Sequence, residues 1–414
     1  MSQQATSGND NTDFHTELGI PLLTIPNAKE ACKLTWKAGQ IPCLVGVAGI
    51  GKSEALKQCA KELSIAEGVT YGCRSLFAPL LPPEKIQGLP FRSQENPNTV
   101  KTLIDEELWN TVHAHEQGVL IIDEINRADD DTLKALFVLM SERRTGIFEL
   151  PPGWVLACAM NPTGADYKVN DITSDPAMRR RLVFLGMQPD TKIWLDYAIK
   201  AGFHPAVINF ISATPDLLLD TRTRAAGKVY ANPAGWEKVS KYLYSAGEEQ
   251  RTDSWYSILK YATGGTVGTN TASEFVDFVK DEDLLMLPID VIEHYAKPSS
   301  KISEKVGLAL EGKGDAASRH DKVVALIRGV AIQILSAQPA LDSSLSGNFS
   351  AFFNDLPEEL RQLFSSEVTT RAESGTEADR KYLAAFTKHM GRNRIFIKAT
   401  KELLQGHKEI QKKT

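Results

Sequence analysis

The stretch from Val45 to Ser53 constrains this chain more than any other. It reads VGVAGIGKS and fits the phosphate-binding loop pattern G-x-x-x-x-G-K-[ST] at every specified position. The glycines let the backbone curl tightly, so that several N–H groups can turn inward toward phosphate oxygens. The lysine brings a positive charge to the β- and γ-phosphates, and the hydroxyl that follows can ligate Mg²⁺. We therefore expect a set of consecutive residues to bind nucleotide: Gly46, Ala48, Gly49, Ile50, Gly51, Lys52, Ser53 and Glu54.

The residues on either side of the loop supply the context that this motif requires. Cys43–Val45 is a short apolar run, typical of a buried parallel strand. After the loop, apolar residues recur at helical spacing from Ala55 to Leu63, and a helix that begins there points its N-terminus at the anion. This order of strand, loop and helix predicts an α/β fold and argues against a glycine-rich turn that binds nothing.

A second motif, VLIIDE at residues 119–124, carries two carboxylates at the end of an apolar run. A buried strand of this kind brings its acids to the carboxyl edge of a parallel sheet, where ligands bind. We expect Asp123 to hold Mg²⁺, directly or through water, and Glu124 to orient and activate the attacking water. Strands often end in acids, so it is the phosphate loop upstream that makes this run indicate nucleotide hydrolysis.

Two further polar sites follow apolar strands. Asn161 ends the run Trp154–Met160, where its amide could hold the catalytic water, although an Asn-Pro pair also favours a simple turn. Three adjacent arginines, residues 179–181, precede the last apolar run, Leu182–Leu185. They fit a solvated basic patch or, given the nucleotide motif upstream, an arginine finger that reaches a neighbouring active site.

The composition is that of an ordinary globular protein, with 42% hydrophobic and 24% charged residues. A formal net charge of −5 argues against a broadly basic surface for nucleic acid. No apolar run approaches the roughly 20 residues that a membrane span needs. The five cysteines form no C-x-x-C pair and are typical of reduced core residues, so we expect a cytoplasmic protein.

A chain of 414 residues predicts two or three domains. We expect a disordered leader over residues 1–16 and a nucleotide-binding domain over 17–188. Helical patterns predict a lid over 189–281 and a helical C-terminal region over 282–414.

Some local patterns make narrower predictions. Residues 77–97 are rich in proline and glycine and predict an insertion over one face of the sheet, whereas residues 99–115 predict one helix. Asp130 or Asp131 is expected to cap the helix after the second motif. The serine-rich stretch 343–350 predicts a flexible link.

In combination, the motifs resemble the MoxR-like branch of the AAA+ ATPases over about residues 20–280. The resemblance is carried by the phosphate loop, DEINRA at 123–128, Asn161-Pro162, DPAMRRR at 175–181, LPPGW at 150–154 and PPEKIQGLP at 82–90. Related dynein-like and McrB-like ATPases share the DEINRA form, so the superfamily is better marked than the branch.

This resemblance implies an αβα nucleotide-binding domain with a helical lid, assembled into a ring, usually a hexamer, with ATP and Mg²⁺ at the subunit interfaces. Asn161 would be the sensor-one residue. Arg181, with Arg180 as the second choice, would be the finger that reaches the neighbour's γ-phosphate. MoxR-like proteins are thought to be chaperone-like remodellers, often with a partner that carries a von Willebrand factor A domain.

One departure from the family pattern concerns the lid. The family typically has a Pro-Arg pair at the start of a lid helix, with the arginine as sensor two, but the matching stretch 232–236 reads NPAGW. Arg222 or Arg224 could substitute. Two alternative functions therefore stay open beside an ATP-driven remodeller: a McrB-like nucleic-acid-associated NTPase motor that prefers GTP, and a nucleotide-gated assembly module with little turnover.

Overall fold

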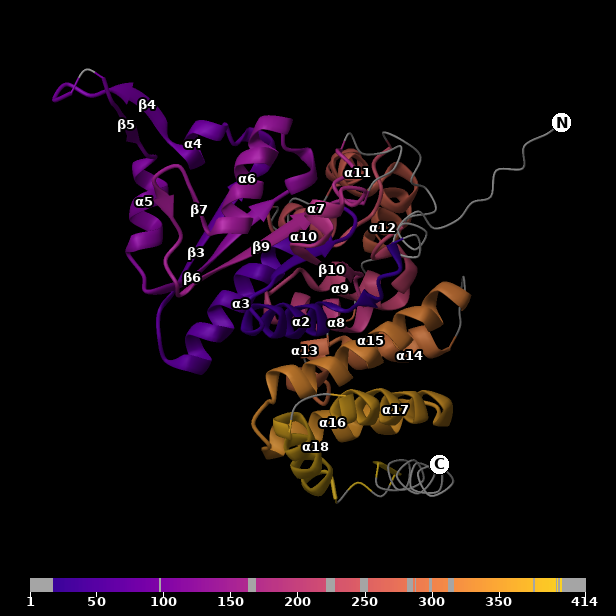
Figure 1. The fold of residues 1–414 in the computed structure, drawn as a ribbon. Helices are drawn as coiled ribbons and strands as arrows, with labels where there is room; N and C mark the ends of the chain where they lie inside the picture. Colours follow the sequence, from indigo (N-terminus) through magenta and orange to yellow (C-terminus); the bar gives the residue numbers. More distant parts are fainter. Residues whose placement is uncertain are drawn as a thin grey trace. The chain divides into compact units, whose positions relative to one another are not determined.

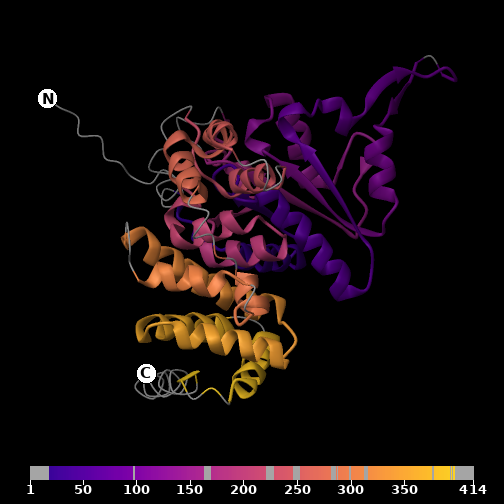
Figure 2. The same cartoon turned by 180° about the vertical axis from the view of Figure 1, so that it is seen from behind.

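The computed structural model describes residues 18–96, 98–162, 169–220, 228–245, 252–280, 286, 288–297, 300–311, 316–374, 377–391, 393 and 395–396. The chain divides into two compact units, which Figures 1 and 2 show from opposite sides. The first unit comprises residues 1–190 with 221–228 and 232–234, and the second comprises 191–220, 229–231 and 235–414.

The first unit is built on a six-stranded parallel sheet with the strand order β1-β10-β2-β9-β6-β3. Its strands are β1 (Leu22–Leu23), β2 (Ile41–Val45), β3 (Tyr71–Phe77), β6 (Gln117–Asp123), β9 (Trp154–Met160) and β10 (Leu182–Met187). The central strands β2, β9 and β6 are almost wholly buried, which explains why they appear in the sequence as continuous apolar runs. The expected α/β fold is confirmed.

Helices cover the sheet and fix its strands in place. They are α2 (Ile25–Lys37), α3 (Lys52–Glu67), α4 (Pro83–Gln87), α5 (Glu106–His113), α6 (Asp130–Glu142) and α7 (Pro176–Arg179), with short 3₁₀ turns η1 (Ala78–Leu80) and η2 (Ile125–Arg127). Trp36 anchors α2, because its indole N–H donates to the buried carbonyl of Leu156 at 2.8 Å. The cap of α6 is Asp129 and not Asp130 or Asp131, since its carboxylate accepts from the Thr132 N–H at 2.7 Å.

The segment 99–115 is not the single helix that its pattern predicts. Val100–Leu103 forms strand β5, which pairs antiparallel with β4 (Leu89–Arg92), and helix α5 begins only after Asp105. β-Branched residues in β5 favour a strand, and the Asp105 carboxylate caps α5 by accepting from the Leu108 N–H at 2.8 Å. The β4–β5 hairpin therefore projects away from the sheet and does not lie over its face (Figure 1).

The second unit is helical throughout its described part. Its helices are α8 (Thr191–Lys200), α9 (Pro205–Ala213), α10 (Pro233–Tyr244), which starts in the first unit, α11 (Asp253–Val267), α12 (Thr269–Lys280), α13 (Pro288–His294), α14 (Ile302–Leu310), α15 (Ala316–Ala337), α16 (Ser343–Asp355), α17 (Glu358–Ser374) and α18 (Glu377–His389), with the 3₁₀ turn η3 (Pro215–Leu217). One core gathers around Trp236 and Phe275, and another around Phe349 and Phe364. The division between lid and C-terminal region at residue 281 stays a prediction.

The stretch 343–350 is not the flexible link that its serines predict but the first half of α16. Asp342 caps this helix by accepting from the Leu345 N–H at 2.8 Å. Leu345 and Phe349 lie four residues apart on one buried face, and their burial outweighs the weak helix propensity of the serines around them.

The cysteines and the helices add two observations. Cys32, Cys43, Cys59 and Cys158 are buried, Cys73 is exposed, and all five are free thiols. Burial raises the pKa of Cys59 to about 12, so this thiol is protonated at neutral pH. Within the described residues, no helix is both long enough and apolar enough to cross a membrane.

Candidate functional site

The phosphate-binding loop occupies the turn between β2 and α3. Gly49 and Gly51 have φ angles of +81° and +91°, in the left-handed region that side-chain-bearing residues rarely adopt. Gly46 meets a different constraint, because a Cβ there would lie 2.8 Å from the carbonyl oxygen of Met187. The backbone therefore requires glycine at all three positions, as a loop that wraps phosphate must.

Lys52 begins α3 and turns its side chain into the loop, where it is only 8% exposed. Its Nζ donates to the carbonyls of Gly46 at 2.8 Å and Val47 at 3.0 Å, and to Asn161 Oδ1 at 3.0 Å. Burial lowers the pKa of Lys52 to about 8, although the nearby carboxylates of Asp123 and Glu124 act in the opposite direction. The structure thus brings the loop lysine together with the expected sensor-one residue.

Ser53 and Asp123 meet at the same edge of the sheet. The Ser53 hydroxyl donates to Asp123 Oδ2 at 2.6 Å, which puts a hydroxyl and a carboxylate side by side at the start of α3. Hard oxygen ligands of this kind are what Mg²⁺ prefers, so these two residues fit the ion that the sequence implies. The other loop positions differ in exposure: Ile50 is buried beneath the loop, whereas Ala48 and Glu54 are exposed.

Glu124 follows Asp123 in a left-handed conformation, with φ of +52°. Its N–H donates to Asp123 Oδ1 at 3.1 Å, and its carboxylate oxygen Oε2 accepts from Arg127 Nη1 at 2.5 Å. The candidate base is therefore paired with an arginine of its own chain. The sequence contained this arginine in its DEINRA run, but the run pointed only to a family and not to a contact.

Asn126 ties the turn η2 to the end of β9. It is fully buried, and its Nδ2 donates to the carbonyl of Asn161 at 2.9 Å. Its own carbonyl accepts from the Asn170 N–H at 2.7 Å. Sequence reasoning missed Asn126, because nothing in a single sequence distinguishes a buried asparagine from a surface one.

The adjacent arginines have different environments. Arg181 donates from Nε to Ser141 Oγ at 2.5 Å and from Nη1 to the Ala177 carbonyl at 2.9 Å. Its guanidinium also lies 3.9 Å from the centre of the Phe137 ring. Arg179 and Arg180 are exposed. Among the described residues, Arg181 contacts α6 and α7 and not the phosphate loop of its own chain.

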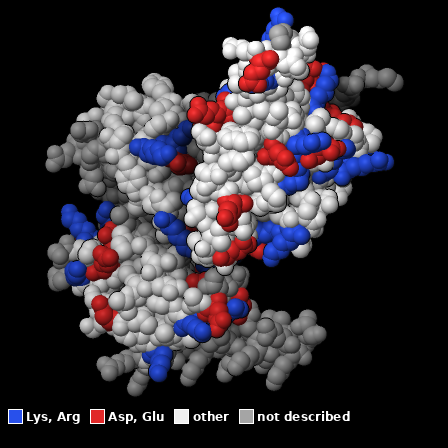
Figure 3. All heavy atoms as spheres, turned by 60° about the vertical axis from the view of Figure 1, so that its left-hand side comes forward, with Lys and Arg blue, Asp and Glu red and all other residues white. Residues whose placement is uncertain are grey.

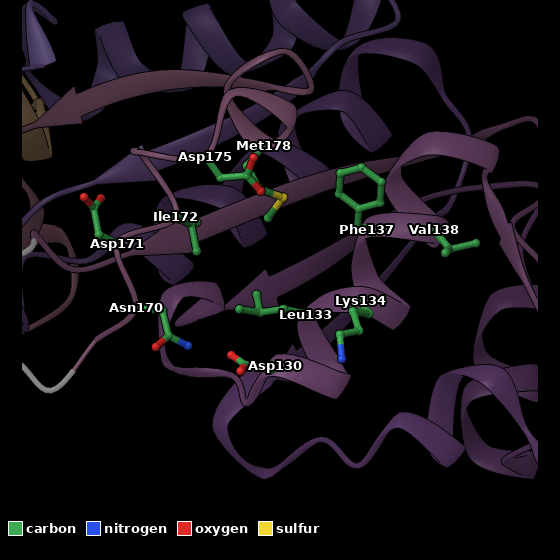
Figure 4. Close-up of a pocket in the computed structure, with 10 residues that line it drawn as sticks. All are labelled: Asp130, Leu133, Lys134, Phe137, Val138, Asn170, Asp171, Ile172, Asp175 and Met178. Atoms are coloured by element: carbon green, nitrogen blue, oxygen red, sulfur yellow. The ribbon is translucent and has the colours of Figure 1, made fainter.

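A groove of about 550 Å³ runs beside these arginines. Figure 4 shows Leu133 and Phe137 of α6 on one side of it and Ile172 and Met178 on the other. Acidic residues also line it: Asp130, Asp171 and Asp175. Because Phe137 also contacts Arg181, the groove and the arginine cluster share one face of the first unit.

The first turn of α10 contacts the phosphate loop. The Ala234 N–H donates to the Gly49 carbonyl at 3.1 Å, and a Cβ at Gly49 would lie 2.4 Å from Asn232 Oδ1. These residues belong to the stretch in which the sequence lacks a sensor-two arginine. Arg222 and Arg224, the suggested substitutes, lie outside the described residues.

Charge is mixed on the surface that Figure 3 shows. Lys and Arg side chains lie interspersed with Asp and Glu over the described residues of that face. A continuous basic stripe, which a nucleic-acid track would present, is not seen there.

Comparison with protein families identifies the kind of domain that contains the phosphate loop, the two acids and Asn161. Residues 42–200 match the family described as AAA domain (dynein-related subfamily). This segment is therefore similar to an AAA domain. It contains the phosphate loop, both strand-end acids, Asn161 and the arginine cluster, so the chain binds nucleotide and is an ATPase. A search of curated proteins found no match to the sequence.

Solved structures resemble the chain only distantly. A mutant of RuvB from Thermotoga maritima is 15% identical, with a TM-score of 0.31, and the match covers 74% of this chain and 84% of that one. RuvB described as a Holliday junction branch migration motor is 13% identical, with a TM-score of 0.30 and coverage of 76% and 86%. A Cytophaga hutchinsonii protein provisionally described as an ATPase is 13% identical, with a TM-score of 0.31 and coverage of 87% and 94%. Likeness at this level carries no argument about function.

Proposed function

We propose that this AAA ATPase hydrolyses ATP at the interfaces of a ring of identical subunits and uses the cycle to remodel a protein partner. The observation that carries the proposal is the contact set at the sheet edge. Lys52 Nζ lies 3.0 Å from Asn161 Oδ1, Ser53 Oγ lies 2.6 Å from Asp123 Oδ2, and Glu124 follows directly.

In this proposal, the chain's residues divide the work of phosphoryl transfer to water. Lys52 and the loop N–H groups bind the β- and γ-phosphates, and in doing so Lys52 exchanges its bonds to two carbonyls and Asn161 for bonds to phosphate oxygens. Ser53 and Asp123 would hold Mg²⁺, which supplies neutralisation of charge on the phosphate oxygens when it is bound. Glu124 orients the attacking water and accepts its proton, and Asn161 holds that water in line.

The ring enters the proposal because the motif resemblance implies that an arginine of a neighbouring subunit completes each site. A finger supplied by a neighbour is worth about 10³–10⁵ in rate. Arg180 is exposed and has no side-chain contact to break within the described part of the chain, whereas Arg181 would first have to leave Ser141 and Phe137. We therefore place Arg180 ahead of Arg181 for this role, the reverse of the order that the motif suggested. The groove beside them (Figure 4) would then face the adjacent subunit.

The finer identity also belongs to this proposal. The motif resemblance supports a MoxR-like remodeller, in a hexamer, with a partner that carries a von Willebrand factor A domain. Interspersed charge on the face in Figure 3 gives no support to the alternative of a nucleic-acid motor. ATP turnover stimulated by a protein fraction and not by DNA would separate the two.

The deciding experiment combines hydrolysis with binding. ATP turnover is measured against protein concentration, with the molar mass recorded on the same samples, and we expect specific activity to rise steeply as a ring forms. Lys52→Ala should abolish ATP binding, Glu124→Gln should bind ATP without turnover, and Lys57→Ala, an exposed lysine on the same helix, should match wild type. Equal ATP affinity in wild type and Lys52→Ala would refute the site. Tight binding with no turnover at any concentration would leave the nucleotide-gated module as the better function.

A further inference from the structure

We propose that Arg127 is a positioning residue that holds the Glu124 carboxylate in the orientation needed to activate water. The inference rests on the proposed role of Glu124 in hydrolysis and adds a residue to it. Arg127 Nη1 donates to Glu124 Oε2 at 2.5 Å. This contact uses one carboxylate oxygen and one guanidinium nitrogen, so Oε1 keeps its lone pairs for a water molecule.

Glu124 needs such a partner because of where it stands. Its backbone is in the left-handed region, just beyond the last residue of β6, and its side chain is 24% exposed. A glutamate side chain has several rotatable bonds, and an unheld carboxylate would populate several rotamers. Only a rotamer that directs the carboxylate toward the attacking water can act as the catalytic base.

Arg127 can hold the carboxylate in one orientation because its own backbone is held in place. The Arg127 N–H donates to the Glu124 carbonyl at 2.8 Å and closes the turn η2. Its neighbour Asn126 is fully buried and bonded to the carbonyl of Asn161. These bonds connect the turn that carries Arg127 to the end of β9, where Asn161 Oδ1 accepts a hydrogen bond from Lys52.

A simpler account would make Arg127 a counter-ion for the acids at the start of α6. Two of those three acids have other partners: Asp129 caps α6 by accepting from the Thr132 N–H at 2.7 Å, and Asp131 pairs with Lys134 at 2.8 Å. Arg127 instead forms an ion pair with Glu124. This distribution favours the catalytic carboxylate as the group that Arg127 serves.

The surroundings of Arg127 offer a direct test. Its side chain is 45% exposed and lines an open cavity of about 850 Å³, together with Asn126, Asn170 and the three acids at the start of α6, Asp129, Asp130 and Asp131. Removing the side chain leaves space in which a guanidinium ion from solution can take its place beside Glu124.

The experiment measures kcat and ATP affinity for wild type, Arg127→Ala, Arg127→Lys and Glu124→Gln, with Arg144→Ala as a control at an exposed arginine on β7 (Arg144–Thr145). We expect Arg127→Ala to lower kcat by about 10–100-fold, because misplacing a catalytic group by about 1 Å can cost 10²-fold. ATP affinity should stay within about twofold, since the phosphate-binding residues are untouched. Arg127→Lys should recover part of the loss, and low millimolar guanidinium chloride should raise kcat of Arg127→Ala but not of wild type or Arg144→Ala.

A double variant shows whether Arg127 acts through Glu124. In a Glu124→Gln background, Arg127→Ala should cause no further loss of the residual rate, and an additive loss would overturn the proposal. So would an unchanged or increased kcat in Arg127→Ala, or a loss that neither lysine nor guanidinium restores. Wild-type turnover in Glu124→Gln would remove the proposed function and this inference together. An active Arg127→Ala beside an inactive Glu124→Gln would remove only the inference.

Discussion

The hydroxyl of Ser53 lies 2.6 Å from Asp123 Oδ2, although the residues belong to the start of α3 and the end of β6. The two strands that lead to them, β2 and β6, are separated in the sheet by β9. Parallel strands end at one edge, so residues distant in sequence arrive there together.

We predict that Asp123→Asn and Ser53→Ala will raise the Mg²⁺ concentration needed for half-maximal ATP hydrolysis by about tenfold or more. Each change removes one hard oxygen ligand or its charge, and outer-shell and ligand losses typically cost 10–100-fold in metal affinity. A Mg²⁺ titration of turnover measures this, with binding of ATP in EDTA as the control that should change little. An unaltered Mg²⁺ requirement in both variants would place the ion elsewhere.

The pKa of Lys52, lowered by burial to about 8, predicts a pH dependence of nucleotide binding. Below this pH the ammonium is already charged and ready for phosphate. Above it the free protein loses the proton, and binding must take the proton back, so ATP affinity should fall by up to about tenfold per pH unit. Calorimetry from pH 7 to 9.5, in buffers of different ionisation enthalpy, measures both the affinity and the proton uptake.

The control for this prediction is Lys52→Arg, whose guanidinium stays protonated over the whole range and should remove the slope from whatever binding remains. The same lysine also makes the free energy of unfolding depend on pH. Its folded pKa lies below its unfolded value, so the cost of burying the charge is fully present below about pH 8 and is relieved as the pH rises toward 10.5. Flat affinity and no proton uptake in wild type would contradict the assigned pKa.

Mixing variants will distinguish the two candidate fingers. We predict that Arg180→Ala will lose about 10³-fold in turnover while still binding ATP, because a finger in trans carries at least this much. When Arg180→Ala is mixed with Lys52→Ala, which keeps its arginines but cannot bind ATP, activity should return. It should return at interfaces where an Arg180→Ala subunit binds ATP and a Lys52→Ala subunit supplies the arginine. Arg181→Ala tests the other assignment, and recovery confined to the Arg181 mixture would restore the original order.

The second unit contains an ion-pair network whose loss should be costly. Arg371 is 9% exposed at its side chain and pairs with Asp196 at 3.1 Å and Glu367 at 3.5 Å. We predict that Arg371→Ala lowers the free energy of unfolding by about 3 kcal/mol, because it removes a largely buried guanidinium from its two partly buried carboxylate partners. Lys381→Ala, which breaks an exposed pair with Glu377, should change it by less than about 0.5 kcal/mol. Urea denaturation of both variants measures the difference, and equal values would refute a structural role for Arg371.

Much of the nucleotide-binding unit follows from its sequence. The motif at 45–53 requires a particular loop backbone. The buried strands around it are continuous apolar runs, and the run Trp154–Met160 predicts both ends of strand β9 correctly. The acids at 123 and 124 and Asn161 are predicted because strand ends are where a parallel sheet collects polar groups.

What the sequence does not predict depends on partners distant in the chain. Arg181 reads as an outward arginine, yet Ser141 and Phe137 of α6 hold it, and no local pattern encodes that contact. The strand at 100–103 exists because β4 pairs with it, and the helix at 343–355 because Phe349 finds a core. In each case tertiary contact overrides local propensity.

Helix α15 contributes Ile332 to the core around Trp236 and Val330 and Ile334 to the core around Phe349. With 22 residues, α15 is about 33 Å long. Because this one helix packs into both cores, the two cores cannot rotate independently of each other. A rotation of α8 and α9 is therefore a rotation of α16 and α17 as well, and its displacement grows with distance from the pivot. Mechanical work delivered to α8 and α9 would therefore also be available at α16 and α17.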